Sequence, residues 1–326
     1  MRVRPGVDSG HMTSSAIAVS GLRKAFGDKV VLDGIDLDVR AGTVFSLLGP
    51  NGAGKTTTVN VLTTLMNADS GTVRIAGHDV ATEAKAVRAV IGVTGQFAAV
   101  DELLTGQENL QLMVDLSPVP AADGRRIVTD LLERFELVES ARKPASTYSG
   151  GMRRKLDLAM TLVGKPRIIF LDEPTTGLDP RSRRTMWDII RQLVAEGVTI
   201  FLTTQYLDEA DRLADRIAVL DQGKLVAQGT PSELKRLIGG SHVRLRFAGD
   251  AELDAAQQVL TDSTRDAEDD LTLRIPSDGR AKSVRDLLDQ LDAHSIDVEE
   301  FSVHTPDLDD VFLSLTGRTN TKVNAS

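Results

Sequence analysis

Short hydrophobic runs alternate with amphipathic stretches over residues 16–238 of the chain. Strands are predicted at 17–19, 30–32, 35–39, 43–48, 70–77, 89–94, 167–172 and 198–203, and helices at 57–66 and 182–195. The runs at 43–48 and 167–172 are apolar almost throughout, as in strands that are buried on both faces. Strands and helices in alternation indicate an α/β domain.

One block interrupts this alternation. Residues 101–147 carry apolar side chains at helical spacing, with a break at Ser117-Pro-Val-Pro120. We interpret this block as a helical subdomain inserted into the α/β domain, over about residues 97–164.

A second, smaller domain is predicted after Gly239-Gly240. Strands at 242–247, 271–275 and 298–303 alternate there with helices at 253–260, 281–294 and 308–315. We therefore expect an accessory α+β domain over 241–317, with a regulatory or dimer-stabilising role. Residues 1–15 and 318–326 are expected to be a disordered leader and tail.

Composition narrows the possible functions. The chain of 326 residues has 41% hydrophobic and 26% charged residues, as in a soluble globular protein. It has no Cys, which excludes disulfides and thiol catalysis, and no apolar run near the roughly 18 residues of a membrane span. Residues 241–326 hold 9 Lys and Arg against 18 Asp and Glu, which accounts for the whole net charge of −9. A nucleic-acid partner would need a basic surface, so none is expected.

The strongest motif lies between the predicted strand 43–48 and the helix that follows it. Its residues are Gly49, Pro50, Asn51, Gly52, Ala53, Gly54, Lys55 and Thr56. They fit the phosphate-binding template G-x-x-x-x-G-K-[ST], in which backbone N–H groups and a helix N-terminus surround a phosphate. We expect Lys55 to reach the β- and γ-phosphates of a nucleotide, Thr56 to bind Mg²⁺ and Thr57 to complete the loop. A glycine-rich turn before an ordinary helix is the alternative, which the flanking strand and the Lys-Thr pair disfavour.

Two adjacent carboxylates end the apolar run 167–172. Asp172 and Glu173 match the Walker B pattern, the acidic partner of a phosphate loop. A charged pair at the end of a buried strand is costly unless it binds a metal or a partner. We expect Asp172 to hold Mg²⁺ and Glu173 to orient a water molecule for attack on the γ-phosphate.

Four further features are ambiguous when they are taken singly. Phe26 could stack on a purine or be a half-buried strand residue, and Gln96 could bind Mg²⁺ or be an ordinary loop residue. Ser149-Gly150-Gly151 could bind an anion or merely cap the next helix, and Asp179 could be an N-cap before Pro180.

Taken together and in this order, the motifs resemble those of ATP-binding subunits of ATP-binding cassette (ABC) transporters over residues 16–238. The resemblance implies a P-loop NTPase fold with ATP and Mg²⁺ as ligands. It implies that Phe26 stacks on adenine, that Gln96 is the Q-loop glutamine, that Ser149-Gly-Gly151 is the signature and that Asp179 lies in the D-loop. The helical subdomain would then contact separate membrane permease subunits.

Two departures from the family pattern stand out. Tyr148 and Met152 flank the intact Ser-Gly-Gly core where Leu and Gln are common. Gln205 stands where the family has a switch histidine. A carboxamide can still donate to the γ-phosphate, but it cannot titrate near neutral pH. We therefore expect Gln205 to act as a catalytic γ-phosphate sensor without shuttling protons, with hydrolysis slower than usual.

The sequence around these departures is similar to that of the daunorubicin/doxorubicin resistance ATP-binding proteins, down to the C-terminal segment Leu308–Leu313. The resemblance implies an ATPase subunit that powers export of a drug, an antibiotic or a complex lipid. It also implies a second nucleotide-binding subunit, in a homodimer, and a peripheral location on the cytoplasmic face of the cell membrane. One alternative is a soluble ABC ATPase that acts on ribosomes or DNA, but such proteins usually carry two cassettes or a basic or coiled-coil insertion. Another is a P-loop kinase or GTPase, which would not need the Ser-Gly-Gly turn.

Overall fold

The computed structural model describes residues 15–96, 98–238, 241–266, 269–278, 280–304 and 306–316. The predicted leader lies almost wholly outside these residues, and so do the predicted tail and the Gly239-Gly240 boundary. The chain divides into two compact units, and the boundary between them in the sequence lies between Thr230 and Pro231. This division lies before the domain boundary expected from the sequence, and the bounds of the two domains stay a prediction.

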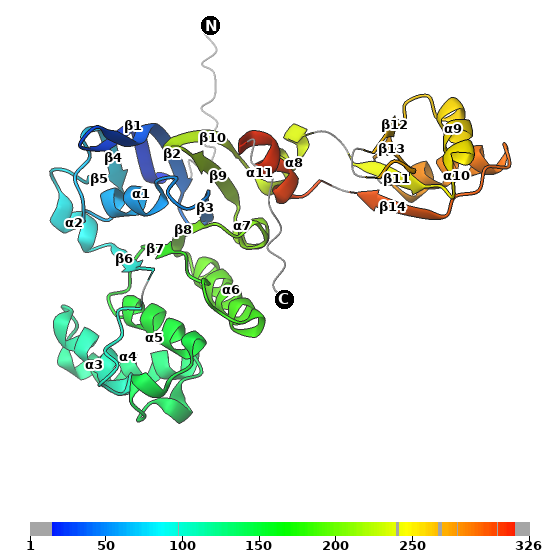
Figure 1. Ribbon diagram of the computed structural model, residues 1–326. Coiled ribbons are helices and arrows are strands. Elements are labelled where there is room, and N and C mark those ends of the chain that lie inside the picture. Colours follow the sequence, from blue (N-terminus) through cyan, green and yellow to red (C-terminus); the bar gives the residue numbers. More distant parts are fainter. Residues whose placement is uncertain are drawn as a thin grey trace, which may run out of the picture. The chain divides into compact units, whose positions relative to one another are not determined.

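The first unit is an α/β domain, as predicted (Figure 1). In chain order its elements are β1 (Ser15–Phe26), β2 (Lys29–Arg40), β3 (Val44–Leu48), α1 (Lys55–Leu62), β4 (Ser70–Ile75), β5 (His78–Asp79), α2 (Ala84–Arg88), β6 (Ile91–Thr94), α3 (Gly106–Leu116), α4 (Ala121–Arg134), η1 (Val138–Ser140), η2 (Ala145–Thr147), α5 (Gly150–Leu162), β7 (Ile168–Asp172), α6 (Pro180–Ala195), β8 (Thr199–Thr204), α7 (Leu207–Leu213), β9 (Arg216–Asp221) and β10 (Lys224–Gly229).

Two sheets form its frame. A six-stranded sheet has the order β10-β9-β3-β8-β7-β6, and β9, β3, β8, β7 and β6 are parallel neighbours in it. A second sheet, β2-β1-β4-β5, is antiparallel. Two short strands were predicted at 30–32 and 35–39, but β2 is one strand through Asp33-Gly34, paired along its length with β1.

Alternate residues of the central strands enter two different cores. Phe45 of β3 and Phe201 of β8 stack at 5.5 Å between ring centroids and belong to the core that β1, β2 and α1 complete. Ile200 and Leu202 of the same strand belong to the other core, with helices α3 to α6. Because both faces are covered, these strands are apolar throughout, which explains the continuous runs in the sequence.

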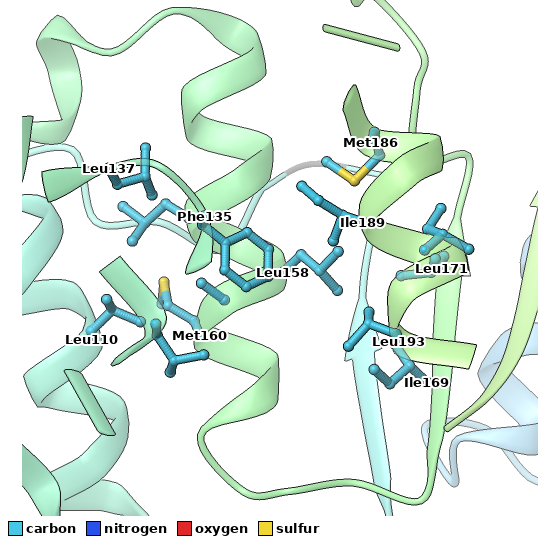
Figure 2. Close-up of a cluster of buried hydrophobic side chains, with 14 of the residues drawn as sticks. Leu110, Phe135, Leu137, Leu158, Met160, Ile169, Leu171, Met186, Ile189 and Leu193 are labelled. Atoms are coloured by element: carbon cyan, nitrogen blue, oxygen red, sulfur yellow. The ribbon is translucent and has the colours of Figure 1, made fainter. Parts of the chain in front are cut away.

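Helices α3, α4 and α5 lie together at one end of the first unit (Figure 1). Thr105 and Glu108 form a capping box at the start of α3, which fixes where that helix begins. Figure 2 shows Phe135, Leu158 of α5 and Ile189 of α6 directed towards one another within a single core. Helix α5 therefore connects the other helices of the helical subdomain with the α/β frame.

The second unit has its own core. Its elements are α8 (Pro231–Lys235), η3 (Arg236–Ile238), β11 (His242–Arg246), α9 (Asp250–Val259), β12 (Thr264–Arg265), β13 (Thr272–Pro276), α10 (Ala281–Asp292), β14 (Glu300–His304) and α11 (Leu308–Thr316). Val243 and Leu245 of β11 pack with Leu253 of α9 and Leu287 of α10. The antiparallel sheet has the order β12-β13-β11-β14, so this unit is the α+β domain that was expected.

Candidate active site

Four predicted motifs follow four neighbouring strands of the six-stranded sheet. Leu48 of β3 lies beside Thr204 of β8, and Thr203 of β8 lies beside Asp172 of β7. Strand β6 is the next parallel neighbour, and Gln96 comes two residues after its end. Because these strands are parallel, the phosphate loop, Gln205, Glu173 and Gln96 all leave the sheet at the same edge.

The phosphate loop depends on close backbone approach. A Cβ added at Gly49 would lie 2.3 Å from the carbonyl oxygen of Leu220, so a larger residue cannot occupy this position. Gly54 has φ of 113°, in the left-handed region, and a Cβ there would lie 2.7 Å from Cδ2 of Leu32. Helix α1 begins at Lys55, two residues earlier than predicted, so its N-terminus borders the loop. Glycines are therefore required at both positions, and the helix N-terminus that follows them is the kind of place where a phosphate can bind.

Lys55 and Glu173 meet at this edge of the sheet. The ammonium Nζ of Lys55 lies 3.3 Å from Oε1 of Glu173, and both side chains are buried. Nζ also donates to the carbonyl oxygens of Gly49 (2.8 Å) and Pro50 (3.2 Å), at the start of the loop. The structure thus brings two of the three predicted catalytic residues into direct contact.

The two carboxylates of β7 are held differently. Asp172 accepts a hydrogen bond from the hydroxyl of Thr203 on β8. Glu173 has φ of 50°, which turns the chain after the strand, and its Oε2 accepts from Thr176 at 3.3 Å. The neighbouring carboxylates therefore have separate partners, in keeping with the separate roles expected for them.

Gln205 directly follows β8 and is half-buried. Its neighbour Tyr206 packs against the guanidinium of Arg183 on α6, 5.0 Å from the ring centroid. Next to this segment, Glu209 of α7 is fully buried and accepts hydrogen bonds from Thr175 (2.8 Å) and Trp187 (3.1 Å).

Burial raises the pKa of the Glu209 carboxyl, although its hydrogen bonds act in the opposite direction and lower it. Sequence reasoning missed Glu209 because its partners come from distant segments.

The signature and the D-loop are adjacent within one subunit. Ser149 caps α5 by accepting from the N–H of Met152. Asp179 caps α6 and also accepts from the hydroxyl of Ser182 at 2.6 Å. A Cβ at Gly151 would lie 2.5 Å from Oγ of that same serine. Ser149 and Asp179 therefore do cap helices, and capping does not exclude a role in nucleotide binding.

Tyr148 explains one departure from the family pattern. Its ring is buried in the core of the helical subdomain, and its hydroxyl donates to the carbonyl oxygen of Ser140 at 2.7 Å. A Cβ at Gly106 would lie 2.2 Å from that hydroxyl, so the glycine makes room for the phenol. Burial raises the pKa of Tyr148. Its position is structural, which leaves the Ser-Gly-Gly core unchanged.

Other predicted residues lie at the surface. Phe26 ends β1 and is 49% exposed, with the Lys24 ammonium 5.6 Å from its ring centroid. Thr56 and Gln96 are also exposed, whereas Asp172, the third predicted metal ligand, is buried. Hydroxyl, amide and carboxylate oxygens from Thr56, Gln96 and Asp172 form a donor set that suits Mg²⁺. The individual roles of these residues stay predictions.

Comparison with known proteins decides the family. A family model described as "ABC transporter" matches residues 32–176, and one described as "ATP-binding protein DrrA1-3-like, C-terminal domain" matches residues 229–316. The daunorubicin resistance ATP-binding protein DrrA3 of Streptomyces coeruleorubidus is 49% identical, over 94% of this chain and 97% of its own. The chain belongs to the daunorubicin/doxorubicin resistance ATP-binding protein family of ABC transporters. Its resemblance to that family, seen in the motifs, is thereby confirmed.

Two more comparisons support the same family. The daunorubicin/doxorubicin resistance ATP-binding protein DrrA of Streptomyces peucetius is 47% identical, over 93% of this chain and 92% of its own. Among solved structures, an ATP-binding cassette of an ABC transporter in its ADP conformation has a TM-score of 0.61 and 26% identity, over 68% of this chain and 93% of its own. This family member is an ATP-hydrolysing, nucleotide-binding subunit of an ABC exporter. The relatives give no support to the alternative of an ATPase that acts on ribosomes or DNA.

No helix within the described ranges of the chain is long and apolar enough to cross a membrane. The same residues hold no cluster of three or more His, Cys, Asp or Glu side chains suited to a metal.

Proposed function

We propose that ATP binds with its phosphates in the loop 49–56 and that Glu173 activates the attacking water. The contact between Lys55 and Glu173 carries this proposal, because it places a cation and a carboxylate at one point of the sheet edge. Lys55 would exchange its present carbonyl and carboxylate partners for phosphate oxygens. Glu173 would then be free to accept a proton from the water.

Each remaining residue has a place in this scheme. Gln205 would donate from its amide to the γ-phosphate. Thr56, Gln96 and Asp172 would hold Mg²⁺, which supplies charge neutralisation between the β- and γ-phosphates when it is bound. Phe26, exposed at the end of β1, would stack on the adenine. Lys55 and the loop N–H groups would stabilise the charge that develops on the γ-phosphoryl group and on ADP as the bond between them breaks.

We further propose that two copies of this chain act as a homodimer. Ser149 and Gly150 are exposed at the start of α5, where the helix N-terminus can bind an anion. ATP would lie between the phosphate loop of one subunit and Ser149-Gly-Gly151 of the other. Opening and closing of this dimer would drive separate permease subunits at the cytoplasmic face of the membrane.

We propose an anthracycline-like antibiotic as the exported molecule. The two relatives described above carry daunorubicin or doxorubicin resistance in their names and match this chain over nearly its whole length. A test is uptake of fluorescent daunorubicin into inverted vesicles that contain this subunit and its permease. Accumulation that depends on ATP and is lost in Lys55→Ala supports the proposal. Vesicles with intact ATPase activity but no accumulation would rule out this class of cargo.

The catalytic assignment has a direct test. Glu173→Gln keeps the size of the side chain but removes the base, so it should bind ATP, lose turnover and accumulate as a nucleotide-bound dimer. Phosphate release and size-exclusion chromatography with ATP and Mg²⁺ measure these effects. An exposed acid on α6, Asp188, provides the control as Asp188→Asn. Full hydrolysis by Glu173→Gln would refute the role of Glu173.

A further inference from the structure

Arg154 is a buried arginine on the signature helix α5, 8% exposed, for which the scheme above has no role. Its guanidinium donates to three backbone carbonyl oxygens of the β7 end: Pro174 (from Nε, 3.0 Å), Asp172 (from Nη2, 3.1 Å) and Glu173 (from Nη2, 3.4 Å). It also donates from Nη1 to the carbonyl oxygen of Gly95, at 2.7 Å. Gly95 directly precedes Gln96, so one side chain joins the signature helix to two other motifs.

Asp157, one turn further along α5, adds to these contacts. Arg154 and Asp157 are together called the bridge below. The Oδ2 of Asp157 lies 3.4 Å from Nη1 of Arg154, and its Oδ1 accepts from the N–H of Ala99 at 2.9 Å. It is 3% exposed. The segment that carries Gln96 is therefore bound to α5 on both sides, at Gly95 by the arginine and at Ala99 by the aspartate.

Burying the Arg154–Asp157 ion pair costs desolvation free energy, so stability alone does not account for its position. Burial lowers the pKa of Arg154, against the attraction of Asp157, and raises the pKa of Asp157. A buried ion pair is weak evidence for stability, since apolar residues can often replace it without loss. A planar guanidinium, however, can hold several carbonyl oxygens in fixed positions at once, which an apolar side chain cannot do.

We propose that Arg154 and Asp157 are positioning residues for hydrolysis: they couple the placement of α5 to the Gln96 segment and to the backbone of Asp172 and Glu173. This inference rests on the proposed role of Glu173. When the Ser149-Gly-Gly151 end of α5 engages a nucleotide, the bridge sets the backbone of the base and of the Gln96 loop. Geometry of this kind affects turnover more than binding, because a misplacement of about 1 Å can lower a rate about 100-fold.

Two conservative variants of the full-length chain test the coupling. Arg154→Lys keeps the charge but loses the planar fork. Asp157→Asn keeps an acceptor for Ala99 but loses the negative charge facing Arg154. The matched control is Arg134→Lys, in an arginine–carboxylate pair with Glu196 (2.8 Å) that joins α4 to the residue after α6, away from the sheet edge. For each, we would measure ATP turnover, equilibrium binding of a fluorescent ATP analogue and the thermal unfolding midpoint.

The expected result is a split between binding and turnover. Arg154→Lys and Asp157→Asn should lower kcat at least about tenfold, with the dissociation constant of the analogue changed less than about threefold. Both should melt below the wild type, because each disturbs a buried ion pair, but they should remain folded at the assay temperature. Wild-type turnover in both folded variants would overturn the inference, and so would a loss of turnover matched by an equal loss of analogue binding. If Arg154→Lys fails to fold, Asp157→Asn decides alone by the same criteria.

Glu173→Gln, measured in parallel, separates this inference from the function on which it rests. Normal turnover by Glu173→Gln would overturn the role of Glu173 and the bridge with it. Loss of turnover by Glu173→Gln together with normal turnover by the folded Arg154→Lys and Asp157→Asn variants would overturn the bridge alone.

Discussion

The ammonium of Lys55 lies 3.3 Å from the carboxylate of Glu173, within a buried pair that joins the phosphate loop to the end of β7. Removing one member of a buried pair leaves the other charge uncompensated, which typically costs about 3–5 kcal/mol. The phosphate loop and the Glu173 carboxylate are therefore coupled in stability.

Lys55→Met should abolish binding of a fluorescent ATP analogue and also destabilise the fold, by about 3 kcal/mol. Urea unfolding measures the second effect. Because the loss comes from the uncompensated carboxylate, the double variant Lys55→Met/Glu173→Gln should recover part of the stability without recovering ATP binding. Equal stabilities of Lys55→Met and wild type would show that the two side chains do not interact in solution.

Gln205→His should leave kcat unchanged or raise it, by up to about tenfold, because an imidazole can also donate to the γ-phosphate and can in addition titrate. The wild-type dependence of kcat on pH should show no step from this position. The variant should gain a step near pH 6–7, the ordinary range of a histidine. The measurement is turnover at saturating ATP over pH 5.5–9. Loss of ATP binding in the variant would contradict the sensor role.

Tyr148→Phe should destabilise the helical subdomain by about 1 kcal/mol, because it removes the hydrogen bond to the Ser140 carbonyl without changing the ring. Gly106→Ala should be destabilising in the wild type, where its Cβ would lie 2.2 Å from the hydroxyl. That loss should be smaller in the Tyr148→Phe background, where the hydroxyl is gone. Chemical unfolding of the four proteins in this cycle measures the coupling, and strictly additive changes would disprove the contact.

Asp179 should make stability sensitive to acid. Hydrogen bonds from the Ser182 hydroxyl and N–H lower the pKa of its carboxyl in the folded chain. Since the folded pKa is lower than the unfolded one, the contribution is present above about pH 4 and is lost as pH falls through the folded pKa. The difference in unfolding free energy between wild type and Asp179→Asn should therefore be largest at pH 7 and should shrink as the pH falls below about 4. A difference that persists unchanged at low pH would argue against this cap.

The second unit should regulate the ATPase or stabilise the dimer, a role suggested by its separate acidic composition. Its core residues and those of the first unit form separate clusters, so a chain ending at Thr230 should fold. That truncation should bind the ATP analogue within about threefold of the full chain, a change below 1 kcal/mol. It should differ in turnover or in dimerisation, measured by sedimentation. No change in either would exclude both roles.

Much of the fold follows from local patterns. The runs at 43–48 and 167–172 are apolar because the strands are covered on both faces, and their ends carry the motifs. The boundaries of helices were less well predicted: α1 ends at Leu62 rather than at Met66, because Thr64 adopts a left-handed conformation with φ of 65°. A threonine gives no sequence signal for such a conformation.

The connections among motifs were not predictable in the same way. Arg154, Asp157 and Glu209 each bind groups from distant segments. Arg154 donates to backbone carbonyl oxygens, Asp157 accepts from a backbone N–H, and Glu209 accepts from a hydroxyl and an indole N–H. Every residue has a backbone carbonyl, so the sequence around that carbonyl does not indicate which side chain will bind it.

The sequence by itself determined the chemistry, because a phosphate loop, a Walker B pair and a Ser-Gly-Gly turn are local arrangements of residue types along one strand, turn or helix. The tertiary structure decided which of these groups touch. Lys55 meets Glu173 only because β3, β8 and β7 are parallel neighbours in register. Arg154 reaches Gly95 and Glu173 only because α5 packs against that sheet edge, which is a property of the whole domain.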